Sequence, residues 1–212
     1  MALLSAVLAA VLAYLIGSIN FAIITSKLVI KRDIREYGSG NAGMTNVLRI
    51  LGKWPAVAVT AGDFLKGVTA ILIGRWLAEA FLGEASVYID HVAALAATLG
   101  HCFPVFHKFK GGKGILVSAG IILMTEPLAL AIMLTVFIVL TLSTRIVSVG
   151  SIAAAAVYPV LILVIGLVSG SEYLVPDLLS AVIRAALVIW MHRGNIRRLL
   201  NVTENRFGKK KA

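Results

Sequence analysis

Glycines, short polar residues and one arginine crowd the segment YGSGNAGMTNVLR at residues 37–49. Gly38, Gly40 and Gly43 fit the pattern G-x-G-x-x-G, which binds a dinucleotide only when a strand precedes it. The preceding residues, KLVIKRDIRE, are charged and do not predict that strand. The glycines would nevertheless let backbone N–H groups approach an anion closely. Arg49 adds a bidentate fork that suits phosphate.

We therefore interpret 37–49 as a phosphate-binding segment. A solvated glycine-rich turn is the alternative, but it leaves the density of polar residues unexplained. The neutral donors of the segment are Ser39, Asn41, Thr45 and Asn46.

A second polar segment, GHCFPVFHKFKGGKG, ends at residue 114. Lys110 and Lys113 flank Gly111 and Gly112, and an apolar run follows. A loop that leads into a helix N-terminus attracts anions through free N–H groups and the helix dipole. Lys113 stands where such a site needs a point charge, whereas Lys110 is explained as well by a basic flank that fixes membrane topology.

The third polar segment, MHRGNIRRLLNVTENRFGKKK, begins at residue 191. His192 and Asn195 are spaced i, i+3, so a helix that continues from the preceding apolar run would present them on one face, and Arg198 continues that face. The final lysines, 209–211, suit contact with anionic lipid headgroups.

These segments are embedded in a strongly apolar chain of 212 residues, with 59% apolar residues, 14% charged residues and a mean hydropathy of +0.95. Soluble domains carry about 25% charged residues. We predict an all-α integral membrane protein with a single domain, 1–212. The net charge of +10 then reflects topology rather than nucleic-acid binding. Cys102 is the only cysteine, which excludes an internal disulfide and a thiolate cluster.

Seven apolar runs are candidate transmembrane helices, although the fourth is short for a bilayer of about 30 Å. With seven spans, 17 of the 20 basic residues fall on one side, which predicts a cytoplasmic C-terminus and an outside N-terminus. All three polar segments would then converge on the cytoplasmic face. The runs are roughly 2–26, 54–77, 86–102, 114–125, 127–143, 147–169 and 174–191.

Asp63, Lys66 and Arg184 are charged residues that lie well inside these spans. Asp63 and Lys66, spaced i, i+3, are expected to pair, whereas Arg184 has no obvious local partner and could meet Asp63 or extend toward the interface. The carboxylates of the cytoplasmic segments are too scattered to predict a metal site. We expect no metal and no cofactor.

Together the three polar segments resemble one family, the bacterial PlsY acyltransferases, which use acyl phosphate and glycerol 3-phosphate. The likeness rests on GSGNAGMTNVLR, GHCFPVFHKFKGGKG and HRGNIRRLL in this order, with DFLKG between the first two. Met44 and Asn201 depart from the family pattern, as does GKGILV, which lacks a hydroxyl near residue 117.

The resemblance implies transfer of a fatty acyl group from acyl phosphate to the 1-hydroxyl of sn-glycerol 3-phosphate. The products would be lysophosphatidic acid and phosphate. The resemblance also implies that the protein lies in the bacterial inner membrane, in contact with its lipids. Gly111 and Gly112 would hold the head of the acyl phosphate, with Ser148 nearby. Glycerol 3-phosphate would bind among Ser39, Arg49, Lys113, His192 and Asn195.

The general base stays open between His192, since histidine titrates near neutral pH, and a phosphate oxygen of a substrate. The second is favoured because the segments are rich in cations and poor in carboxylates. A transporter for an organic phosphate is the alternative function, but transporters place their site near the midplane between repeated halves. No internal repeat is visible here.

Overall fold

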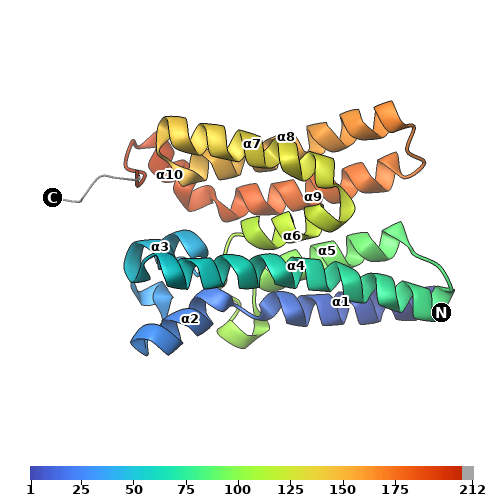
Figure 1. Ribbon diagram of the computed structural model, residues 1–212, viewed down its shortest axis with the longest axis horizontal. Helices are drawn as coiled ribbons and strands as arrows, with labels where there is room; N and C mark the ends of the chain where they lie inside the picture. Colours follow the sequence, from blue (N-terminus) through green and yellow to red (C-terminus); the bar gives the residue numbers. More distant parts are fainter. Residues whose placement is uncertain (207–212) are drawn as a thin grey trace. The chain divides into compact units, whose positions relative to one another are not determined.

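The computed structural model describes residues 1–206, and all regular structure in this part of the chain is helical (Figure 1). The prediction of an all-helical chain is therefore confirmed for these residues; Lys209, Lys210 and Lys211 lie outside them. The chain forms two compact units, Met1–Thr125 and Glu126–Ala212. Among the described residues, six helical segments are long and apolar enough to cross a membrane.

The first unit contains six α-helices and two short 3-10 helices. Their bounds are α1 Ala2–Ser18, α2 Phe21–Ile30, η1 Ile34–Glu36, α3 Met44–Leu51, α4 Lys53–Leu82, α5 Val87–Cys102, η2 Val105–His107 and α6 Ile115–Thr125. Helix α4 packs against α1, α5 and α6 along its length, and α2 and α3 lie beside its N-terminal part (Figure 1). The loops of the first two polar segments therefore connect helices that share α4 as a support.

Close helix packing in this unit depends on glycines. A Cβ at Gly17 or Gly100 would overlap a backbone carbonyl of the facing helix where α1 meets α5. Gly67 and Gly120 have the same role between α4 and α6. Small residues let helix backbones approach in a membrane, where packing rather than the hydrophobic effect drives association.

The predicted first span is interrupted. Helix α1 ends at Ser18, and α2 starts after Asn20, whose side-chain Oδ1 accepts a hydrogen bond from the N–H of Ile23 at 3.0 Å. This bond caps the new helix, because an asparagine at the N-cap satisfies one of the free N–H groups of the first turn. The interruption redirects the chain toward the first glycine-rich loop.

The second unit is built from α7 Pro127–Thr144, α8 Val147–Ser169, α9 Leu174–Met191 and α10 Arg193–Leu200. Helix α8 packs against both α7 and α9. Arg184 of α9 is buried and finds partners within this unit: its Nη2 donates to the Tyr158 hydroxyl at 2.6 Å, and its Nε donates to the Ser180 carbonyl at 3.3 Å. The sequence showed no obvious local partner for Arg184, and this interpretation is wrong, because Ser180 lies on the same helix four residues earlier.

The short fourth run forms α6, a helix of 11 residues. At 1.5 Å per residue it reaches about 17 Å, well short of a bilayer core of about 30 Å. Seven full spans thus remain a prediction, whereas the six longer segments have the length and hydropathy of transmembrane helices.

Candidate functional site

The first glycine-rich loop, residues 37–43, is closed by the side chain of Asn46. Its Oδ1 accepts from the N–H of Ser39 at 3.0 Å, and its Nδ2 donates to the carbonyls of Ile34 at 3.2 Å and Tyr37 at 3.0 Å. Asn46 is 1% exposed. Sequence reasoning placed it among the substrate ligands, but the structure engages both ends of its amide with the backbone. Its role in the structure is to hold the loop.

Beyond this closure, the loop opens onto the start of α3. Gly38 and Gly40 adopt φ values of +59° and +70°, a conformation that favours glycine. Gly43 is the N-cap of α3 and supplies no side-chain bond, so the first N–H groups of α3, at Met44 and Thr45, face an uncapped helix end. Such an end attracts anions. Arg49 lies in the last turn of α3 and is exposed.

The second glycine-rich loop folds back on the end of α5. The N–H of Gly111 donates to the Cys102 carbonyl at 3.1 Å, and the N–H of Gly112 donates to the His101 carbonyl at 3.0 Å. These two N–H groups were expected to face a phosphate, and the structure uses them internally. Lys113 follows directly, half-buried, and precedes the start of α6.

The two loops touch each other at Gly112. A Cβ added there would lie 2.8 Å from the carbonyl oxygen of Ala42 and would overlap Nε2 of His101. The same Ala42 carbonyl accepts a bond of 3.4 Å from Nδ2 of Asn20, the residue that starts α2. The break between α1 and α2 thus fixes the place where the loops meet.

A second connection between the loops runs through Arg35 of η1. Its Nη1 donates to the carbonyls of His107 at 2.9 Å and Lys110 at 2.7 Å. Asp33 holds the guanidinium from the other side, with Oδ2 2.7 Å from Nη2. Partial burial by itself would raise the pKa of Asp33, but the hydrogen bonds and charge of Arg35 outweigh it and leave the pKa below its usual value.

Behind the second loop lies a buried group of charged and polar side chains. Asp63 and Lys66 of α4 pair as the sequence predicted, with Nζ 2.9 Å from Oδ1. Lys66 also donates to the Ile19 carbonyl at 2.7 Å. His101 of α5 places Nδ1 3.6 Å from the same Oδ1 of Asp63. The structure thus gives His101 a charged partner.

In the second unit, His192 lies at the turn between α9 and α10 and is buried. Its Nδ1 is 2.8 Å from the Val188 carbonyl. Because a carbonyl can only accept, Nδ1 carries the hydrogen in this bond, and the basic lone pair of a neutral ring is then on Nε2.

Glu204 organises the other two predicted residues of this segment. Its Oε1 accepts from Nδ2 of Asn195 at 2.9 Å, and its Oε2 accepts from Nε of Arg198 at 2.8 Å. The predicted helix that continues from the last span is interrupted, because α9 ends at Met191, α10 begins at Arg193 and His192 lies between them. Asn195 and Arg198 do share one partner.

Ser148 lies in the first turn of α8, and its hydroxyl is buried without a hydrogen-bond partner among residues 1–206. Its predicted role near the acyl phosphate stays a prediction. In the same part of the chain, no group of three or more His, Cys, Asp or Glu side chains could hold a metal ion.

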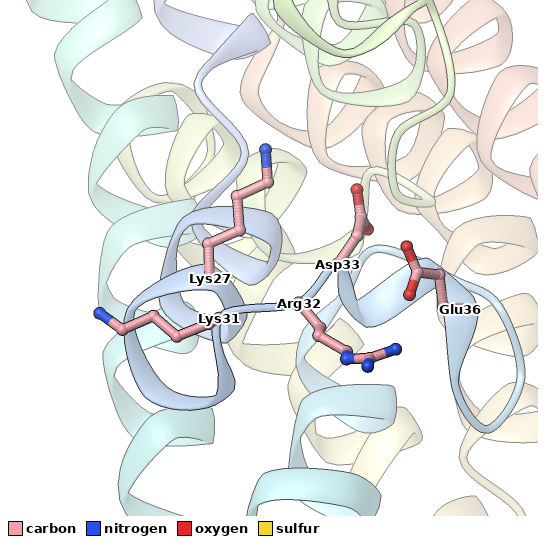
Figure 2. Close-up of a pocket in the computed structure, with 5 residues that line it drawn as sticks. All are labelled: Lys27, Lys31, Arg32, Asp33 and Glu36. Atoms are coloured by element: carbon pink, nitrogen blue, oxygen red, sulfur yellow. The ribbon is translucent and has the colours of Figure 1, made fainter.

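A pocket of about 570 Å³ lies on the basic stretch between α2 and η1. Figure 2 shows that its three cations point in different directions, so they do not converge on one point as a phosphate site requires. We therefore assign no substrate to it. The lining residues are Lys27, Lys31, Arg32, Asp33 and Glu36.

Sequence reasoning missed three residues that hold these segments. Asn20 carried a signal, because a polar residue inside an apolar run is uncommon and often structural or functional. Arg35 was counted only as a topology charge, and Glu204 only as an isolated carboxylate. Nothing in their spacing pointed to the backbone carbonyls and side chains that they bind.

Comparison with known proteins identifies the same family as the resemblance of the three polar segments. The family model for glycerol-3-phosphate acyltransferase matches residues 7–202. A relative named glycerol-3-phosphate acyltransferase from Thermoanaerobacter pseudethanolicus is 44% identical over 97% of both chains. Another from Clostridioides difficile, with the same name, is 38% identical over the full length of both.

Two solved structures are similar in fold. Both are crystal structures of PlsY (YgiH), described as an integral membrane glycerol 3-phosphate acyltransferase, 39% identical to this chain and covering 96% of both chains. The glycerol 3-phosphate form has a TM-score of 0.84, and the lysophosphatidic acid form has a TM-score of 0.79.

Proposed function

Because the chain belongs to the glycerol-3-phosphate acyltransferase family, we propose that it transfers a fatty acyl group from acyl phosphate to the 1-hydroxyl of sn-glycerol 3-phosphate. The observation that carries this proposal is the match along nearly the whole chain to relatives with that name. A protein of this family is an integral membrane acyltransferase of lipid biosynthesis. A phosphate transporter, the alternative from the sequence, has no support from the family.

The proposed reaction needs no covalent intermediate on the enzyme. The hydroxyl oxygen of glycerol 3-phosphate attacks the acyl carbonyl carbon, and the bond from that carbon to the phosphate oxygen breaks. Lysophosphatidic acid and inorganic phosphate are the products, and the hydroxyl proton passes to a base. The protein must position two anionic substrates and offset their charge.

In the first unit, Arg49 and Lys113 are the residues proposed to offset phosphate charge. The uncapped start of α3, with Thr45 in its first turn, supports an anion beside them. Ser39 and Asn41 lie on the same loop and are proposed substrate ligands. Gly111 and Gly112 contribute differently from the first expectation: their N–H groups close the loop, and the absence of side chains gives space.

In the second unit, His192, Asn195 and Arg198 are the proposed contributors, with Ser148 as a neighbour of the acyl phosphate. The bond to the Val188 carbonyl supports a neutral His192 ring with its lone pair on Nε2. This ring could accept the hydroxyl proton. We favour a phosphate oxygen of a substrate as the base, because the polar segments are rich in cations and poor in carboxylates. The carboxylate of Glu204 is already engaged by Asn195 and Arg198.

We propose that the chain crosses the bacterial inner membrane seven times, with the N-terminus outside, the C-terminus in the cytoplasm and one domain from 1 to 212. The distribution of basic residues supports this orientation. Helix α6 would be the short span.

Thiol labelling tests this seven-span topology with single cysteines introduced at residues 84 and 171 in a Cys102→Ala background. Both cysteines should react with a thiol reagent added outside the cell.

The donor is tested with detergent-purified protein, labelled glycerol 3-phosphate and one acyl donor at a time. Acyl phosphate should give labelled lysophosphatidate with one phosphate released per product, whereas acyl-CoA and acyl carrier protein should give none. Equal product with acyl-CoA would overturn the donor assignment. Uptake of glycerol 3-phosphate into vesicles without acylation would favour the transporter.

A further inference from the structure

The ring of His101 supports the second glycine-rich loop from beneath. The backbone of His101 accepts the Gly112 N–H at 3.0 Å, and a Cβ on Gly112 would overlap Nε2 of the same residue. The neighbouring Gly111 donates to Cys102 and would meet the His101 carbonyl if it had a side chain. The loop thus lies directly on His101, and Lys113 follows within one residue.

His101 is in turn held from α4. Its Nδ1 is 3.6 Å from Oδ1 of Asp63, a charge contact that is longer than a hydrogen bond. Asp63 is fixed by the Lys66 ammonium at 2.9 Å, and Lys66 by the Ile19 carbonyl at 2.7 Å. All three side chains are 4% exposed or less. The chain of contacts therefore runs from the α1–α2 break to the loop.

Burying the charged side chains of Asp63 and Lys66 costs free energy that packing alone does not explain. A buried ion pair often stabilises a protein no more than apolar residues of the same volume, and a charge inside a membrane span costs about 2.5–3.5 kcal/mol on insertion scales. Ionisable residues within spans are therefore functional candidates by default. The contacts of this group end at the loop that carries Lys113, which indicates where its function lies.

We propose that Asp63, held by Lys66, is a positioning residue that fixes the ring of His101 and thereby the backbone of Gly111 and Gly112. The proposal deepens the proposed function and rests on it in one respect: Gly111 and Gly112 are taken to hold the head of the acyl phosphate. None of the three side chains is required to touch a substrate.

The test replaces both members of the ion pair, Asp63→Asn with Lys66→Met, so that no lone buried charge is left to unfold the protein. The matched control is Asp90→Asn with Arg75→Gln. Asp63 and Lys66 both lie on α4 and reach α5 through His101. Arg75 of α4 and Asp90 of α5 link the same two helices directly, with Nη2 2.8 Å from Oδ2, but the further contact of Arg75 is the Met124 carbonyl rather than the loop.

The first measurement, amide hydrogen exchange at Gly111 and Gly112, does not depend on activity. Exchange should become at least about tenfold faster in the Asp63/Lys66 variant and stay unchanged in the control, since these amides depend on the local stability of the loop. Unchanged exchange in a folded Asp63/Lys66 variant would overturn the proposal. If that variant does not fold, His101→Gln, which leaves the Asp63–Lys66 ion pair in place, is measured in the same way.

The second measurement separates this inference from the proposed function. The Asp63/Lys66 variant should raise the KM for acyl phosphate about tenfold or more while the KM for glycerol 3-phosphate changes less than about threefold. Equal changes in both constants would contradict the link to the donor. If the unmodified protein shows no acyl transfer at all, the proposed function fails, whereas faster exchange at Gly111 and Gly112 would still support the positioning role.

Discussion

The two glycine-rich loops of the first unit and the α9–α10 turn of the second are built in opposite ways. In the loops, side chains hold the backbone: Asn46 and Arg35 together bind the carbonyls of four residues. At the turn, other groups hold side chains: the Val188 carbonyl binds the ring of His192, and Glu204 binds two side chains.

This difference predicts two kinds of mutational effect. A change in a residue that holds a loop displaces a whole segment of backbone, so that several ligand contacts change together. A change at the turn alters one or two side chains and should affect one kinetic constant. Residues that themselves meet phosphate charge should have the largest effect in either region, since an unmatched charge is costly.

The largest effect is expected from Arg49→Ala and Lys113→Ala. Each removes a cation proposed to face phosphate, and loss of one partner from a desolvated charge pair costs about 2–5 kcal/mol, or a factor of roughly 30 to several thousand in kcat/KM. The assay is acyl transfer at saturating and limiting substrate. Arg32→Ala is the control, since Arg32 is an exposed cation that precedes the first glycine-rich loop in the sequence. Turnover near normal in either test variant would remove that residue from the proposed site.

Asn46→Asp is expected to have the next largest effect. The carboxylate can still accept from Ser39, but it cannot donate to the carbonyls of Ile34 and Tyr37. An unsatisfied buried group costs about 1–3 kcal/mol, so the melting temperature should fall and kcat/KM should drop about tenfold to a hundredfold. Asn201→Asp, at an exposed position, should change neither; if Asn46→Asp raises one KM alone, the residue binds substrate directly.

His192→Ala distinguishes binding from base catalysis at the turn. If a substrate phosphate takes the proton, the variant should mainly raise the KM for glycerol 3-phosphate, by about tenfold or more, as for a lost hydrogen bond to a charged group. The acid limb of the pH–rate profile should remain. A fall in kcat with loss of that limb would instead identify His192 as the base.

Most of the helical layout could be predicted from the sequence, because long apolar runs carry a strong signal. The run 147–169 matches α8 at both ends, and 174–191 matches α9. The break at Asn20 could not be placed by average hydropathy, since one polar residue barely changes the mean of a long run. It depends on a capping bond that only local geometry reveals.

The candidate site was predictable in its residue types but not in its internal bonds. Gly111 and Gly112 were expected to offer N–H groups to a ligand, but buried N–H groups need partners in the folded chain as well, and here they bind His101 and Cys102. Which carbonyl lies within reach depends on how α5 ends. The sequence contains no periodicity that reports such contacts, which is also why Arg35 was missed.

Asp33→Asn tests how the loops are tied together, with a smaller effect. Its carboxylate steadies Arg35, and because the pKa of Asp33 is lowered in the folded protein, this stabilisation is complete above about pH 4 and is lost as the pH falls through the lowered value. At pH 7 the variant should lose about 1 kcal/mol or less, seen as a lower melting temperature.

Between pH 6 and 8 the difference from the unmodified protein should stay constant, and it should shrink only below about pH 4. Glu36→Gln, an exposed carboxylate on the same segment, is the control. A difference that already disappears near pH 6 would mean that another group, and not Asp33, titrates with the fold.

The smallest effect is expected from Glu204→Gln at the turn. The amide can still accept from one neighbour, but the ion pair with Arg198 is lost. Because the Arg198 side chain is 37% exposed, the pair is worth about 0.2–1 kcal/mol, a factor of roughly five or less in kcat/KM. Glu172→Gln, an exposed carboxylate in the same unit, should be silent. A loss as large as that of Asn46→Asp would show that the turn, like the loops, depends on one residue to hold its whole segment.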